Sequence, residues 1–143
     1  MKIEVISKDA VYITINGTVY YIDDSTGERL MKKWKKKIKI GYQDIVIERE
    51  TSTFQKQSDS YGEYDHRKNS ITIQNGLSPL DEANTLLHEI LHGIAYINSL
   101  TQNDQPLDSE NKEEVVINTM TNGLAQVFRD NKWLLPYFKD KFK

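Results

Sequence analysis

Apolar side chains recur at steps of three and four residues between about residues 79 and 99, and this spacing predicts an amphipathic helix. Ser78 followed by Pro79 is typical of a helix start, with serine as the N-cap and proline in the first turn. The apolar stripe would bury one side of this helix in a core. Its members are Ala83, Leu86, Leu87, Ile90, Leu91, Ile94 and Ile97.

A second helix is predicted over about residues 110–130, again from helical spacing of apolar positions. The polar stretch 104–111 between the two helices is broken by Pro106 and predicts a loop. The apolar positions of the second helix are Val116, Ile117, Met120, Leu124, Val127 and Phe128.

The first part of the chain has strand patterns instead. Residues 11–15 and 18–22 are β-branched and aromatic runs, and Asn16-Gly17 between them is a strong hairpin signal. Residues 1–7 add a third predicted strand, and residues 23–27 close this antiparallel β-meander.

A lysine-rich segment follows the meander over residues 28–39. Leu30, Met31, Trp34 and Ile38 have helical spacing, so the segment is predicted to be helical. Its basic residues form either a solvated face or a surface that docks onto an acidic partner or nucleic acid. Residues 1–40 are therefore assigned to an N-terminal meander and basic helical segment, which either belongs to the catalytic fold or is a small appended module.

Three further strands are predicted over residues 43–49, 61–64 and 70–74, the last two forming a hairpin. The strand that precedes the first helix, residues 71–74, has two interpretations. It is either an edge strand that pairs with an extended substrate or an ordinary interior strand. Together these elements predict an α+β fold in which a small mixed sheet and two main helices occupy residues 41–143.

Composition sets limits on function. The chain has 143 residues and 38% hydrophobic residues, enough for one modest core. A net charge of -2 gives no general reason to expect nucleic acid or an anionic membrane as partner. The absence of cysteine excludes disulfides, a cysteine-ligated metal and a thiol nucleophile. No signal-peptide pattern and no membrane-spanning apolar run is present, so a soluble protein is expected.

The sequence His88-Glu89-Ile90-Leu91-His92 falls within the first predicted helix and matches the H-E-x-x-H pattern of zinc hydrolases. Residues four apart share one helical face, so both imidazoles can bind one ion. Glu89 would then lie beside the water that such an ion binds, where a general base acts. The alternative is a pair of surface histidines with no metal.

A catalytic zinc site normally has three protein ligands, so one ligand must come from another element. Acidic residues near the start of the second helix are candidates, although they could simply favour the helix dipole. Predicted burial favours Glu113, whereas Asn118 four residues further on favours Glu114, because it could hydrogen-bond a ligating carboxylate. His66 is predicted to be a loop histidine, with a ligand or oxyanion role as the alternative.

These motifs resemble small phage and prophage metallopeptidases of the ImmA/IrrE-type and minigluzincin group. The resemblance covers about residues 40–135 and is carried by His88-Glu89-Ile90-Leu91-His92-Gly93, by Tyr61-Gly62-Glu63-Tyr64-Asp65 with Ile71-Thr72-Ile73, by Glu113-Glu114-Val115-Val116, by Asn122-Gly123-Leu124, and by Arg129-Asp130-Asn131. Gluzincin-like proteins take their third ligand from the next helix, often with Asp or Asn four residues on, which implies Glu114 with Glu113 in reserve.

The resemblance implies a zincin-like fold, one Zn²⁺ held by His88, His92 and Glu114, and peptide hydrolysis with Glu89 as general base. It also implies a peptide or protein substrate and a cytoplasmic location, inside the host cell if the protein is phage-encoded. Two rivals remain: a catalytically silent regulatory or binding protein of the same fold, and a hydrolase of non-peptide amides such as peptide deformylase, which the missing cysteine disfavours.

Overall fold

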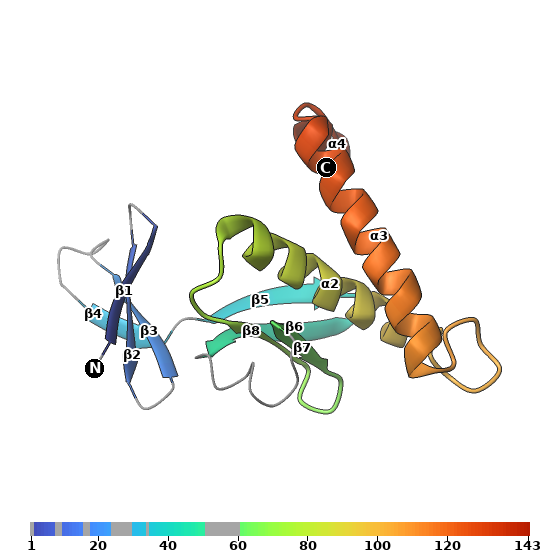
Figure 1. Cartoon of the computed structure of the whole chain (residues 1–143), viewed down its shortest axis with the longest axis horizontal. Helices are drawn as coiled ribbons and strands as arrows, with labels where there is room; N and C mark the ends of the chain where they lie inside the picture. The colour runs from blue at the N-terminus through green and yellow to red at the C-terminus, as the bar shows by residue number, and fades with distance from the viewer. Residues whose placement is uncertain (1, 8–9, 16–17, 24–29, 34, 51–60) are drawn as a thin grey trace.

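The computed structural model describes residues 2–7, 10–15, 18–23, 30–33, 35–50 and 61–143, and it has an α+β fold in which one helix, α2 (Pro79–Ile97), covers one face of a small mixed sheet (Figure 1). The central strands are β5 (Lys35–Ile40), β6 (Gln43–Glu50), β7 (Gly62–Asp65) and β8 (Ser70–Gln74). The helices are α2 (Pro79–Ile97), α3 (Glu110–Asp130) and α4 (Leu134–Lys141). None of these helices combines the length and apolar character needed to cross a membrane.

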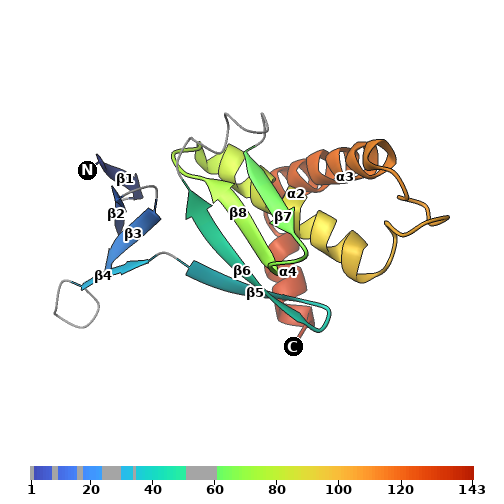
Figure 2. The ribbon, with the colours of Figure 1, turned by 90° about the horizontal axis from the view of Figure 1, so that it is seen from below.

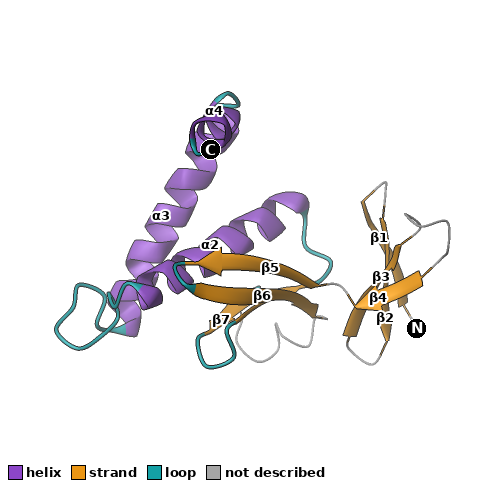
Figure 3. Ribbon diagram, turned by 180° about the vertical axis from the view of Figure 1, so that it is seen from behind, coloured by secondary structure: helices purple, strands orange, loops and turns teal. Residues whose placement is uncertain are grey.

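The predicted N-terminal meander is confirmed. β1 (Lys2–Ser7), β2 (Ala10–Ile15) and β3 (Thr18–Asp23) pair antiparallel in sequence order, and β4 (Leu30–Lys33) adds to β3. Residues 16–17 and 24–27, to which the predicted turns were assigned, lie outside the described residues. The meander lies to one side of the central strands and joins them through the pair Thr18–Glu50 (Figures 1 and 3).

The prediction that residues 28–39 are helical is wrong, because this segment contains β4 and β5. β5 pairs along its whole length with β6 in a hairpin, and this cross-strand pairing overrides the helical spacing of the apolar residues. Trp34, one of those residues, lies outside the described part of the chain. The proposed division at residue 40 falls at the β5–β6 turn, and the assignment of domains stays a prediction.

The basic residues of β5 have a structural explanation. Among the described strands, β5 pairs only with β6, and its lysines are exposed. Lysines on such an edge hinder pairing with another chain. Lys35 Nζ lies 3.2 Å from the Glu48 carboxylate, and Lys39 Nζ lies 3.8 Å from that of Asp44. For these lysines, the interpretation as a solvated face is therefore sufficient, without docking onto an acidic partner or nucleic acid.

The main core lies between the sheet and α2, which crosses one face of it (Figure 2). Alternate residues of β6 and β8 point to this face, as expected for strands with one buried side. The fully or nearly fully buried members are Ile40, Ile45, Ile47, Ile71 and Ile73, and the α2 side chains that pack on them are Leu86, Ile90 and Ile97. The predicted apolar stripe of α2 thus forms one wall of the core.

The predicted hairpin of β7 and β8 is confirmed, and its turn is held by Asp65, which accepts hydrogen bonds from the backbone N–H groups of Arg67 and Lys68. β8 lies between β6 and β7, pairing parallel to the first and antiparallel to the second. The prediction that residues 71–74 form an edge for substrate is therefore wrong, because both sides of β8 are already paired. β7 is the strand at that end of the sheet.

α3 packs on α2 through a smaller cluster made by Ala95, Leu107 and Ile117. Its observed bounds agree with the predicted 110–130, and Ser109 caps its N-terminus by accepting a hydrogen bond from the Lys112 N–H. Beyond this contact α3 extends away from the sheet, and α4 lies near its far end (Figure 1). The start of α3 is therefore held firmly against α2, at the level of the H-E-x-x-H motif.

Candidate metal centre

His88 and His92 project from the same side of α2, one helical turn apart, as the sequence spacing predicts. Their side chains are 19% and 13% exposed, so both rings are largely shielded and still reachable from solvent. The two Nε2 atoms lie 2.9 Å apart. Burial and the neighbouring His92 lower the pKa of His88, which favours the neutral imidazole that a metal ion requires.

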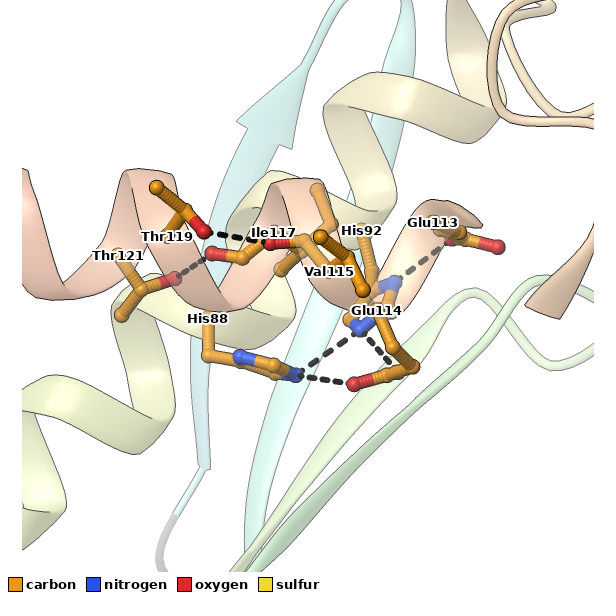
Figure 4. A network of polar contacts seen from close by, with 8 residues as sticks. All are labelled: His88, His92, Glu113, Glu114, Val115, Ile117, Thr119 and Thr121. Carbon is orange, nitrogen blue, oxygen red and sulfur yellow. Dashed lines mark hydrogen bonds and ion pairs between the residues drawn. The ribbon is translucent and has the colours of Figure 1, made fainter. Parts of the chain in front are cut away.

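Glu114, near the start of α3, completes a group of three donors with the two histidines (Figure 4). Its Oε1 lies 2.9 Å from His92 Nε2 and its Oε2 lies 3.6 Å from His88 Nε2. Donor atoms of the three residues all lie within 4.8 Å of one another. The structure therefore brings together three residues that could hold a metal ion.

The spacing of these atoms fits a small tetrahedral ion. Zinc binds histidine nitrogen and carboxylate oxygen at about 2.0–2.2 Å, so two ligand atoms of a tetrahedral site lie about 3.3 Å apart. The two Nε2 atoms lie 2.9 Å apart, His92 Nε2 lies 2.9 Å from Glu114 Oε1, and His88 Nε2 lies 3.6 Å from the other oxygen of that carboxylate, Oε2, so the separations to either oxygen are close to this value. Two imidazoles and one carboxylate are also a donor set that suits zinc.

Glu113 is not part of this donor group. Its Oε1 lies 2.7 Å from Nδ1 of His92, the ring nitrogen on the opposite side from Nε2 (Figure 4). Asn118, whose position favoured Glu114 in the sequence, is exposed. The choice between the two glutamates thus comes from where the side chains point, with Glu114 at one nitrogen of His92 and Glu113 at the other.

Glu89 lines the same cleft as the donor group and is buried, with 6% of its surface exposed. Burial raises the pKa of its carboxyl to about 7, although the charge of His92 and a hydrogen bond from the Tyr64 backbone N–H act in the opposite direction. A carboxylate with a pKa near neutrality can both accept and return a proton at physiological pH. This is the property that a general base needs.

These residues line an open cleft of about 690 Å³ between β7 and the start of α3. His66 lies in the turn after β7, as the loop prediction requires, and stacks on Tyr96 with ring centroids 4.5 Å apart. Both rings line the cleft but neither belongs to the donor group. The cleft thus joins the metal-binding residues, the buried carboxylate and an aromatic wall.

No known protein family, curated protein or solved structure matches this chain. The functional argument therefore depends on the residues and their geometry.

The sequence pattern does not show that β7 approaches α2 closely, and Gly62 explains how it does. A Cβ atom at this position would lie 2.6 Å from Thr85 Cγ2 and 3.2 Å from Glu89 Cγ. A separation of 2.6 Å is shorter than Cβ atoms show in real proteins. Glycine here lets the strand pack against the helix that carries Glu89.

We expect Gly62→Ala to destabilise the protein by about 1–3 kcal/mol, because the added methyl group overpacks the contact between β7 and α2. Chemical denaturation measures the change in the free energy of unfolding. Gly123→Ala is the matched control: a Cβ at this α3 position meets nothing within 4 Å, so alanine should stabilise the helix by up to about 1 kcal/mol. Equal effects of the two substitutions would contradict the close packing at Gly62.

Proposed function

We propose that this protein is a zinc-dependent metallopeptidase of gluzincin type, with His88, His92 and Glu114 as metal ligands and Glu89 as general base. The observation that carries the proposal is the convergence of three suitable donor residues from α2 and α3 in a cleft that a buried carboxylate, Glu89, also lines. Two histidines on one helix and a glutamate from the next form the ligand set of known zinc peptidases.

Glu89 and the Tyr64 backbone have separate roles in the proposed reaction. When bound, a zinc ion polarises a carbonyl and lowers the pKa of a water molecule. Glu89 removes a proton from the attacking water and later transfers it to the leaving amine, which the near-neutral pKa of its carboxyl allows. The Tyr64 N–H holds the carboxylate in position through its hydrogen bond, and burial keeps bulk water from competing for the proton.

A peptide substrate would lie along β7, which among the described strands is the one at the cleft end of the sheet. Strand edges bind extended peptides through backbone hydrogen bonds, while side-chain pockets add specificity. β7 borders the same cleft as Glu89 and the donor group. A peptide added at this edge would therefore pass beside the groups that cleave it.

Metal analysis of purified variants tests the proposal. We expect wild-type protein to bind zinc at a 1:1 ratio and His88→Ala, His92→Ala and Glu114→Ala to lose it, since each removes a donor atom. Glu89→Ala should still bind zinc because Glu89 is not a donor. His66→Ala is the control, since this ring lines the cleft outside the donor group.

Wild-type protein that binds no zinc would exclude the metallopeptidase. If zinc binds as expected but no peptide in a diverse library is cleaved, the catalytically silent binding protein becomes the better explanation. These two measurements separate the metal site from the activity.

A further inference from the structure

The His92 ring makes polar contacts through both of its nitrogens. Nε2 faces His88 Nε2 and Glu114 Oε1, each at 2.9 Å, while Nδ1 lies 2.7 Å from Glu113 Oε1 (Figure 4). The Glu113 and His92 side chains are 22% and 13% exposed, so the Nδ1 contact is partly shielded from water. It therefore holds the ring more effectively than an exposed ion pair would.

This contact fixes the tautomer of the ring when a cation occupies the donor group. A carboxylate oxygen only accepts hydrogen bonds, and His92 faces one at each nitrogen, Glu113 at Nδ1 and Glu114 at Nε2. When a cation takes the lone pair of Nε2, the proton is on Nδ1, which donates it to Glu113. In a neutral imidazole the other nitrogen, Nε2, then presents its lone pair. That lone pair points toward the Glu114 oxygen and His88 Nε2, which is the orientation a shared cation needs.

We infer that Glu113 is a positioning residue, which fixes the tautomer and the rotation of His92 so that Nε2 is presented to the metal. The inference rests on the proposed zinc site and assigns to Glu113 a role that differs from ligation. Carboxylates that orient ligating histidines commonly change metal affinity by 10–100-fold when removed.

A competing explanation is that Glu113 only adds negative charge to the first turn of α3, where the helix dipole favours it. Glu110 provides the matched control for this effect. It is an exposed acidic residue in the same first turn, and it lies outside the donor group. A substitution at Glu110 changes the helix charge without altering the contact to His92.

The test compares Glu113→Ala, Glu113→Gln and Glu110→Ala with wild type in two measurements. Zinc dissociation constants, from competition with a chelator, should rise about 10–100-fold for Glu113→Ala and stay near wild type for Glu110→Ala. Glu113→Gln keeps the side-chain volume and a neutral acceptor, so an intermediate change is expected. Nitrogen NMR of the imidazoles is done in zinc-free Glu114→Ala protein, which lacks the competing carboxylate at Nε2. It should show the Nδ1–H tautomer of His92 when Glu113 is present and a mixture when Glu113 is also replaced by alanine.

Equal zinc affinity in Glu113→Ala and Glu110→Ala, together with a His92 tautomer population that does not depend on Glu113, would overturn the inference. It would also be overturned if Glu113→Ala abolished zinc binding while Glu114→Ala kept it, because Glu113 would then be a ligand. If wild-type protein binds no zinc, the proposed function fails, whereas the NMR measurement still decides what Glu113 does to His92.

Discussion

Glu89→Gln should slow peptide hydrolysis by about 10²–10⁴-fold, the usual contribution of a general base, while zinc stays bound. Glutamine has nearly the same shape and can still accept the Tyr64 N–H hydrogen bond, so the local structure should be preserved. It cannot accept the proton of the attacking water at neutral pH. The defect should therefore appear in kcat, with little change in zinc content.

The measurement is the cleavage rate of a peptide found with the wild-type protein, at matched zinc occupancy. Asp130→Asn serves as the control, because it removes one negative charge from an exposed position at the far end of α3, outside the residues that line the cleft, and should retain the wild-type rate. Removal of zinc with a chelator, followed by its restoration, should abolish and recover activity in wild type. A Glu89→Gln variant with the wild-type rate would show that another group is the base.

The elements that carry the site could be predicted because their signals are local. Both main helices follow from apolar spacing, and the α2 cap from Ser78-Pro79, since contacts within a helix span three or four residues. The spacing of His88 and His92 is likewise an internal property of one helix. These features depend little on what the rest of the chain does.

The arrangement of the strands depends on which segments pair with each other, and this was harder to predict. Residues 35–40 became a strand because β6 pairs with them, despite apolar residues at helical spacing. Which of β7 and β8 is the edge strand depends on β6, which pairs with β8 and covers one of its sides. A hairpin pattern in the sequence identifies two paired strands, but it does not show which of them a third strand will join.

The roles of Glu113 and Glu114 show what could not be predicted from the sequence for single residues. The sequence indicated an acidic pair near the start of α3 but left both as possible ligands. Consecutive helical residues point about 100° apart, so the two carboxylates reach opposite nitrogens of one ring. The packing of α3 on α2 decides which carboxylate meets which nitrogen, and this packing depends on tertiary contacts such as that of Ile117.

The pKa of Glu89 also predicts how the stability of the zinc-free protein varies with pH. The folded protein holds the Glu89 proton until about pH 7, whereas the unfolded chain releases it near the ordinary value of 4.5. A group whose acid form is favoured by folding makes the protein less stable as the pH rises through this range. The loss is complete above about pH 7 and amounts to roughly 3 kcal/mol at most, from 1.36 kcal/mol per pKa unit.

Glu89→Gln removes this titration, so the zinc-free variant should be more stable than wild type at pH 8 by up to about 3 kcal/mol and similar to it near pH 4. Urea unfolding in a chelator, from pH 4 to 8, measures the difference. The lowered pKa of His88 has the opposite effect on the free energy of unfolding, because protonation below the ordinary pKa of histidine favours the unfolded chain. This contribution is the same in wild type and Glu89→Gln, so it cancels in the comparison. A difference that does not grow with pH would mean that Glu89 is ionised in the folded, zinc-free protein. If the difference grows with pH, the burial that raises the pKa of Glu89 for proton transfer also reduces the stability of the protein at neutral pH. Glu89→Gln should then lose activity and gain stability.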